Sequence, residues 1–209
     1  LTTVRFSGCS VRQFPNFIRT SKFWVLDLSN NMISSGISKW KAEGWEGLQL
    51  LDLSHNFLAT LEQFPGNKLE YLNLHSNLLQ GPIASTCLNK ELSAIIISKN
   101  KLTGNIPFSI CKLSSLCILD LSKNNFCGTI PDYLGNFNYL RLLVLQMNNF
   151  IGKIPNSFVN NSELSHLSRN DNQLEGLVPP SLANCTSLKL SNLGHIIHET
   201  LTKFNSNER

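Results

Sequence analysis

The sequence predicts an α/β solenoid, a curved and right-handed stack of short repeats with a parallel sheet along its concave side. A segment of the form L-x-x-L-x-L-x-x-N recurs along the chain at intervals of 21 to 25 residues. Four copies continue with Gly four residues after the Asn and Pro seven residues after it. The 209 residues fit one elongated array, so we expect a single domain over residues 1–209.

The repeats follow one another along the whole chain. We place their starts near residues 1, 23, 48, 69, 92, 116, 140 and 164, with a degenerate ninth repeat from 188. Six copies read LDLSNNMI (26–33), LDLSHNFL (51–58), LNLHSNLL (72–79), IIISKNKL (95–102), LDLSKNNF (119–126) and LVLQMNNF (143–150). So many tandem copies exclude chance agreement, and the pattern is that of a leucine-rich repeat.

Side chains alternate along an L-x-L strand, so the Leu residues point into the stack and the intervening residues point away from it. One repeat cannot bury its apolar face alone, whereas a stack of repeats forms a continuous core. The Asn at each turn both donates and accepts hydrogen bonds, and it satisfies loop backbone that the sheet leaves unpaired. This predicted ladder comprises Asn31, Asn56, Asn77, Asn100, Asn124, Asn148 and Asn172. Cys9 holds the same position in the first repeat, and we expect Cys9 and Cys185 to be small core residues.

The second half of four repeats has a common form: LTGNIP (102–107), FCGTIP (126–131), FIGKIP (150–155) and LEGLVP (174–179). This L-x-G-x-I-P block resembles the plant-specific class of leucine-rich repeats. Longer stretches, such as LHSNLLQGPI, ISKNKLTGNIPFSIC and DNQLEGLVPPSLANCTSL, resemble the ectodomain of plant receptor-like proteins of the Cf-type disease-resistance class. The resemblance covers nearly the whole chain.

The resemblance implies non-catalytic recognition of a protein or peptide ligand in plant defence signalling, with a co-receptor kinase as partner. It implies a glycosylated parent at the extracellular side of the plasma membrane. The chain has no signal peptide, paired-Cys cap or 18-residue apolar run, so we expect an interior fragment whose own location is unknown. Three alternatives stay open: the ectodomain of a receptor kinase that perceives a peptide hormone, a secreted inhibitor of a pathogen wall-degrading enzyme, and a non-functional truncated copy.

The outward residues of the strands form the predicted recognition surface. Asp27, Asp52 and Asp120 look like the default residue of a solvated repeat, whereas three other rungs carry unusual side chains. Exposed apolar groups on a polar ribbon indicate a contact patch. The predicted ligand-binding residues are Asn73, His75, Ile96, Lys99, Lys123, Val144, Gln146 and Met147.

Several further residues have a predicted role. Asn160 and Asn184 lie in N-x-S/T sequons and are predicted glycosylation sites. Trp40 and Trp45 are expected to pack against the outside of the stack, with an aromatic contact site as the alternative. A disulfide between Cys87 and Cys111 is the less favoured alternative to unpaired thiols. His55 and His75 are predicted neighbours on adjacent rungs.

Composition and motifs argue against other functions. The net charge of +4 is mild and the basic residues form no runs, so we expect no nucleic-acid partner. The chain has no G-x-S-x-G, phosphate-binding loop, H-E-x-x-H or C-x-x-C motif, so we predict no catalytic residue, metal site or cofactor.

The repeat pattern fails near the end of the chain. Arg169 occupies the position that Leu121 and Leu145 fill in earlier repeats, and a charge in that core is costly unless it reaches solvent or a partner. In the ninth repeat, Ser191, Ile196 and His198 stand where Leu, Asn and Leu belong.

Overall fold

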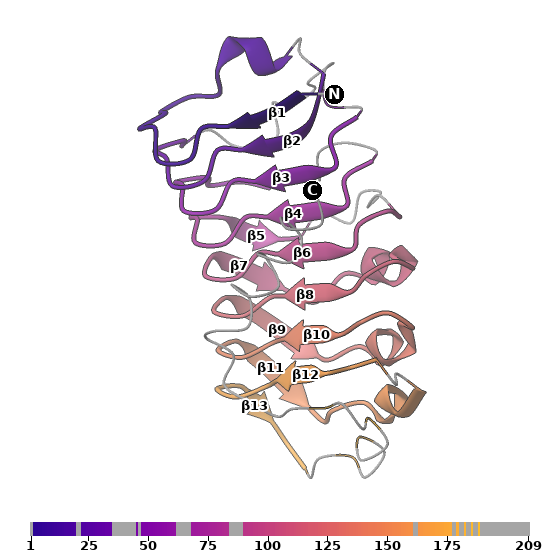
Figure 1. Ribbon diagram of the computed structural model, residues 1–209. Helices are drawn as coiled ribbons and strands as arrows, with labels where there is room; N and C mark the ends of the chain where they lie inside the picture. The colour runs from indigo at the N-terminus through magenta and orange to yellow at the C-terminus, as the bar shows by residue number, and fades with distance from the viewer. Residues whose placement is uncertain are drawn as a thin grey trace.

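The computed structural model describes residues 2–19, 22–34, 45, 47–61, 68–83, 90–160, 163–176, 179, 182, 185 and 188. These residues form an elongated solenoid in which successive turns of the chain stack in one direction (Figure 1). The predicted solenoid with a parallel sheet along one side is therefore confirmed. Within the described residues no helix is long and apolar enough to cross a membrane.

The first sheet has eight strands, one from each rung, in the order β1-β2-β3-β4-β6-β8-β10-β12. Every strand pairs parallel to its neighbour, and the second Leu of each L-x-x-L-x-L stands beside its counterpart, as Leu119 does beside Leu143. The strands are β1 (Thr2–Arg5), β2 (Phe23–Asp27), β3 (Leu50–Asp52), β4 (Tyr71–Asn73), β6 (Ala94–Ile96), β8 (Ile118–Asp120), β10 (Leu142–Val144) and β12 (His166–Ser168). The common register follows from the regular repeat length.

A second parallel sheet, which the sequence analysis does not predict, lies behind the first in the view of Figure 1. Its strands are β5 (Gln80–Pro82), β7 (Lys101–Gly104), β9 (Asn125–Thr129), β11 (Asn149–Gly152) and β13 (Gln173–Leu174). They form where the L-x-G-x-I-P block begins. The Gly of each block has a φ of 77° to 79°, which turns the chain out of this sheet at a backbone conformation that only Gly adopts without strain.

The helical turns of the described residues are short 3₁₀ helices rather than α-helices. They are η1 (Asn16–Arg19), η3 (Phe108–Lys112), η4 (Asp132–Asn136) and η5 (Asn156–Asn160). Pro107 and Pro131 precede η3 and η4 with extended backbone. Four or five residues are too few to establish α-helical hydrogen bonding, and short connectors of this kind commonly adopt the tighter 3₁₀ form.

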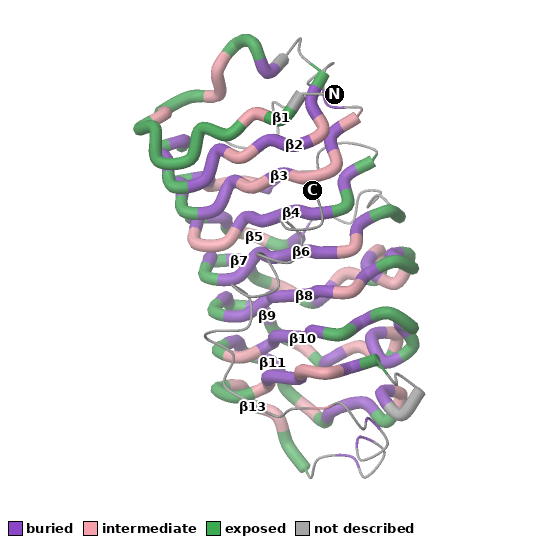
Figure 2. The backbone as a smooth tube through the Cα atoms, viewed as in Figure 1, coloured by how far each residue is buried: buried purple, intermediate pink, exposed green. Residues whose placement is uncertain are grey.

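The main core runs along the axis of the solenoid (Figure 2). The paired Leu residues of the strands are buried, as are Phe126 and Phe150, whose rings stack at 6.3 Å. Trp45 is also buried, and its Nε1 donates to the carbonyl of Ile18 at 2.9 Å. The packing prediction for Trp45 is therefore confirmed, while Trp40 lies outside the described residues.

The side chain of Asn124 shows how one rung is tied to the next. Its Oδ1 accepts the N–H of Leu102 at 3.0 Å. Its Nδ2 donates to the carbonyls of Ile97 on the preceding rung and Leu121 on its own rung, at 3.0 and 3.1 Å. Asn56, Asn77, Asn100 and Asn148 make equivalent contacts. These amides satisfy backbone groups inside the solenoid that neither sheet pairs.

The prediction for Cys9 needs correction, and Arg169 reaches solvent as its charge requires. Cys9 is exposed rather than a core residue, since it lies on the first rung, and its thiol donates to the carbonyl of Ser7 at 3.6 Å. Arg169 is half-buried, so its side chain reaches solvent from a position where Leu121 and Leu145 are fully buried. Cys185 is buried as predicted. Cys87 and residues 189–209 lie outside the described residues.

Candidate functional site

The first sheet presents two or three side chains of each rung on the side away from the main core. In-register pairing places Asp27, Asp52, Asn73, Ile96, Asp120, Val144 and Ser168 in one row across seven strands. Neighbouring strands of a sheet are about 4.8 Å apart, so side chains in this row touch their neighbours. The row is the middle of the concave face.

Ile96 and Val144 are not exposed on this face, so the prediction of exposed apolar groups is wrong for these two residues, whereas Met147 is exposed. Ile96 and Val144 are only 2% and 1% accessible. With four other residues they form a second buried group, separate from the main core, which we call the concave cluster: Tyr71, Ala94, Ile96, Ile118, Leu142 and Val144. The sequence assigns each side chain to a face of the sheet, but it does not show that apolar residues of successive rungs meet there.

The three Asp residues of the row share one local structure with the Ser two residues later. In each, Oδ1 accepts the backbone N–H of that Ser at 2.9 to 3.0 Å and its hydroxyl at 2.7 Å. Burial raises the pKa of the Asp52 and Asp120 carboxyls, while the Ser54 and Ser122 contacts oppose that rise. The Asp-Ser pairs therefore stabilise the backbone at the end of each strand, and that of Asp120 and Ser122 is buried rather than solvated.

Asn73 and His75 are joined to both neighbouring rungs. Asn73 donates from Nδ2 to Oδ2 of Asp52 at 3.0 Å, and Nδ1 of His75 is hydrogen bonded to the Ser98 hydroxyl at 2.8 Å. The rings of His55 and His75 meet edge to face at 5.2 Å, which confirms that they are neighbours. Burial, together with repulsion from His55, Lys99 and Lys123, lowers the pKa of His75 to about 4. His75 is therefore neutral at neutral and mildly acidic pH.

The most accessible side chains of the face follow a backbone feature that the sequence analysis does not predict. The residue before each ladder Asn has a φ of 54° to 57°, in the left-handed region that non-Gly residues rarely adopt. These positions, which we call the left-handed row, are Asn30, His55, Ser76, Lys99, Lys123, Met147 and Asp171. The row brings Lys99, Lys123 and Met147 to the surface on consecutive rungs, and Met147 is 46% exposed. The recurring position immediately before Asn is the signal that would have identified it.

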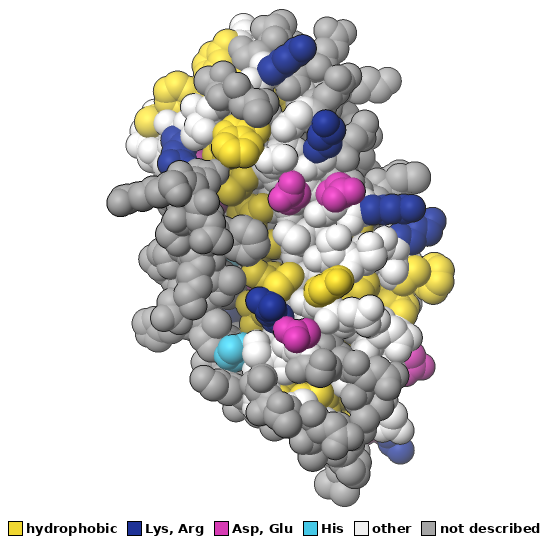
Figure 3. Space-filling view, turned by 45° about the vertical axis from the view of Figure 1, so that its right-hand side comes forward, with side chains coloured by type: hydrophobic (Ala, Val, Ile, Leu, Met, Phe, Trp, Pro, Cys, Tyr) yellow, Lys and Arg dark blue, Asp and Glu magenta, His cyan; other side chains and the backbone are white. Residues whose placement is uncertain are grey.

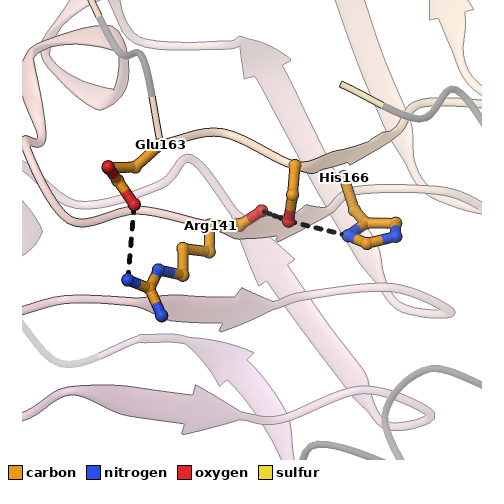
Figure 4. A network of polar contacts seen from close by, with 4 residues as sticks. Arg141, Glu163 and His166 are labelled. Carbon is orange, nitrogen blue, oxygen red and sulfur yellow. Dashed lines mark hydrogen bonds and ion pairs between the residues drawn. The ribbon is translucent and has the colours of Figure 1, made fainter. Parts of the chain in front are cut away.

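Polar contacts continue toward the C-terminal rungs. Gln146 is half-buried, and its Oε1 accepts the Ser168 hydroxyl at 2.7 Å. At the start of β10, Arg141 forms an exposed ion pair with Glu163 at 3.3 Å (Figure 4). The Ser165 hydroxyl donates to the carbonyl of Arg141 and lies 2.8 Å from Nδ1 of His166. Charged side chains of both signs are scattered over the face seen in Figure 3.

This arrangement suits contact with a ligand by hydrogen bonds, ion pairs and apolar packing. The described residues contain no group of three His, Cys, Asp or Glu side chains placed to hold a metal ion. Asn160, a predicted glycosylation site, is the last residue of η5. Asn184, the other predicted site, lies outside the described residues.

Comparisons with known sequences find one family and a set of plant relatives. The model of the family described as Leucine Rich Repeat matches residues 115–137. The chain is similar to Receptor-like protein 7 of Arabidopsis thaliana, with 39% identity over 116 residues that cover 52% of this chain and 11% of that protein. It is 39% identical over 144 residues to Receptor-like protein 18 of the same plant, covering 56% and 17% of the two chains. The chain thus spans a small part of the length of these relatives.

Solved structures of plant receptors have the same fold. One is the plant peptide hormone receptor RGFR1 in complex with RGF2, with a TM-score of 0.73 and 33% identity over 80% of this chain and 27% of that one. Another is the Arabidopsis receptor kinase HAESA in complex with the peptide hormone IDA and the co-receptor SERK1. Its TM-score is 0.73, with 31% identity over 85% of this chain and 30% of that one.

Proposed function

Because the chain is a leucine-rich-repeat protein whose homologues include receptor-like proteins of Arabidopsis thaliana, we propose that it recognises a protein or peptide ligand as part of a receptor ectodomain. Recognition is non-catalytic and serves plant defence signalling. The ligand contacts the concave face and the left-handed row beside it.

One observation carries this proposal: a constant scaffold presents variable side chains. The inward Leu residues and the ladder Asn are nearly the same on every rung, whereas the left-handed row carries His, Ser, Lys, Met and Asp in turn. A scaffold of this kind holds different side chains at fixed spacing, which limits the entropy lost when a ligand binds. The non-Gly residues of this row adopt the left-handed conformation even though it costs about 1–2 kcal/mol per residue.

The predicted binding residues have different parts in this proposal. His75, Lys99, Lys123, Gln146 and Met147 are at least partly accessible and contact the ligand directly. Asn73, Ile96 and Val144 are buried, and they support the surface from beneath.

We assign the parent protein to the extracellular side of the plasma membrane, with a co-receptor kinase as its signalling partner. The relatives named receptor-like proteins support the assignment, as does the solved structure of HAESA in complex with IDA and the co-receptor SERK1. Glycosylation at Asn160 and Asn184 belongs to the same proposal.

Perception of a peptide hormone by a receptor kinase is the second candidate function. It is favoured by the similarity to RGFR1 and HAESA, whose structures hold peptide hormones. The two functions differ in the origin of the ligand, which is microbial or released by infection in the first and made by healthy plant tissue in the second.

Binding of the purified chain tests the proposal. The chain is immobilised and exposed to fractionated extracellular fluid from infected leaves and from healthy leaves. The component that binds is purified, and its affinity for the chain is measured by interferometry. The test variant is Lys99→Asn/Lys123→Asn/Met147→Asn, since Asn tolerates the left-handed conformation. We expect at least about tenfold weaker binding, as is typical when a few central contact residues are removed.

The second sheet and the residue that follows β11 offer a matched control on two of the same rungs. Lys101→Asn/Lys153→Asn/Ile151→Asn also removes two lysines and one exposed apolar side chain, so the net charge changes equally. This variant should bind as the wild type does. Equal losses in the two variants would contradict recognition by the concave face, and a ligand found only in healthy tissue would favour the hormone receptor over the defence receptor.

A further inference from the structure

One carboxylate oxygen in the middle of the concave face has no hydrogen-bond donor. Asp120 is fully buried, and its Oδ1 accepts both the backbone N–H and the hydroxyl of Ser122. Its Oδ2 is buried without a hydrogen-bond partner. Buried polar groups are nearly always paired in folded proteins, so an exception of this kind calls for an explanation.

Asp52 provides an internal comparison because its Oδ1 makes the same two contacts with Ser54. Its Oδ2, however, accepts Nδ2 of Asn73, which stands beside it on the next rung, at 3.0 Å. The residue in that relation to Asp120 is Val144, which has no donor. The difference between the two carboxylates therefore lies in one neighbouring side chain.

The other neighbours of Asp120 do not complete its hydrogen bonding. Ile96 flanks it on the preceding rung and is as buried as Val144. The Ser98 hydroxyl lies beside the carboxylate and favours its ionised form, and its oxygen is also hydrogen bonded to Nδ1 of His75 at 2.8 Å. Even so, Oδ2 of Asp120 is left without a hydrogen bond of good geometry. Lys123 also favours the ionised form, without an ion pair to it.

Ile96 and Val144 belong to the concave cluster and not to the main core. Because the two clusters are separate, a ligand group that entered between Ile96 and Val144 to reach Oδ2 would leave the packing inside the solenoid undisturbed. The apolar surroundings exclude water, which strengthens a hydrogen bond made there.

We propose that Oδ2 of Asp120 is a ligand subsite that accepts a hydrogen bond from the N–H of a primary amide. The amide belongs to an Asn or Gln side chain of the bound protein or peptide, and it is held between Ile96 and Val144. An amide is what Asn73 supplies to the equivalent oxygen of Asp52. The exposed cations Lys99 and Lys123 lie on the same two central rungs, so they disfavour a cationic donor and leave an uncharged one unaffected. The subsite rests on the proposed function, because it takes the concave face as the recognition surface.

A titration with a small amide tests the subsite without the natural ligand. Propionamide is added to the ¹⁵N-labelled chain, and the amide signal of Ser122 is followed by NMR because it donates to the same carboxylate. We expect a saturable shift of Ser122 and none of Ser54, whose Asp52 is already paired. N,N-dimethylpropionamide has the same carbonyl but no N–H, and it should produce no saturable shift.

Two variants make the test specific. Val144→Asn places an amide donor beside Asp120, as Asn73 is placed beside Asp52, so the chain itself supplies a hydrogen bond to Oδ2. Propionamide should then bind about threefold to tenfold more weakly, as expected for one lost hydrogen bond. Asp120→Asn removes the carboxylate and should have the same effect. The dispersion of each spectrum shows whether the variant is folded, and either folded variant suffices.

Equal responses to the two amides, an unchanged response in a folded variant, or no saturable shift in the wild type would overturn the subsite. A stronger saturable response to propylammonium than to propionamide would also overturn it, in favour of a cationic ligand group. None of these results affects recognition through the left-handed row, which the triple variant tests separately.

Discussion

Replacement of Asn124 by Ala is the sharpest test of how the rungs are held together. In the wild type, Oδ1 of Asn124 accepts the N–H of Leu102, while Nδ2 donates to the carbonyls of Ile97, Leu121 and Ser122. The substitution removes all four contacts from a side chain that is 8% exposed.

The magnitude follows from which partners retain another hydrogen bond. The carbonyl of Ile97 also accepts Nδ2 of Asn100, that of Leu121 also accepts Nδ2 of Asn148, and that of Ser122 also accepts the N–H of Lys99. The N–H of Leu102 has no second acceptor among the described contacts, and a buried N–H left unpaired costs about 1–3 kcal/mol. With a further ~0.5–1.5 kcal/mol for the weakened carbonyl contacts, we expect a total of about 1.5–4.5 kcal/mol.

Urea unfolding followed by circular dichroism measures this loss, and hydrogen exchange at the Leu102 amide locates it. Asn125→Ala is the matched control, because Asn125 is exposed on the adjacent position and its loss should change stability by less than about 0.5 kcal/mol. If Asn124→Ala unfolds at the wild-type midpoint, or if exchange at Leu102 is unchanged, the ladder does not stabilise the solenoid as we describe.

Three further substitutions test other parts of the structure. Gly135→Ala should lower the free energy of unfolding by about 1–3 kcal/mol, since a Cβ there would collide with backbone and side-chain atoms of Ser157. Gly47→Ala is the control and should be tolerated, because its Cβ would meet one carbonyl oxygen at 3.7 Å. Similar urea midpoints for the two variants would refute the close approach of η4 and η5. The folded-state pKa of His75 lies below its unfolded value of 6.5, so the unfolded chain binds a proton first and His75 reduces stability as pH falls from about 6.5 to about 4. His75→Gln should therefore lose less melting temperature than the wild type between pH 7 and pH 4.5, and parallel losses would contradict a buried neutral imidazole. Arg169→Leu should raise stability by about 1 kcal/mol because the position can bury an apolar side chain, and an unchanged or lower melting temperature would show that it does not face the core.

Repetition in the sequence predicts the path of the chain well. Leu119, Leu121 and Asn124 recur at the same spacing on other rungs, so each copy supports the same interpretation of the others. The neighbouring positions of His55 and His75 follow from the same register. The second sheet is not predicted, because its strands lie where the L-x-G-x-I-P block begins, and Gly and Pro usually indicate a turn or the end of a strand rather than a strand.

The exposure of the concave face is predicted less well, and Ile96 and Val144 show why. A period of two assigns a side chain to one face of a strand, but burial depends on the side chains of the neighbouring strands. Ile96, Asp120 and Val144 come from three rungs, and their shared environment exists only once the register places them side by side. The same holds for Oδ2 of Asp120, which differs from that of Asp52 through a residue 24 positions away.

The spacing of residue types along the chain is sufficient to predict the solenoid, its parallel sheet, the Asn ladder and the face of the sheet to which each strand residue points. These features depend on the spacing of residue types within one repeat, and the spacing can be read along the chain. The packing of one rung on the next decides which outward residues are buried and which carboxylate is left without a donor. Those properties arise between rungs, where residues more than twenty positions apart share one environment, and no local pattern records what a neighbouring rung supplies.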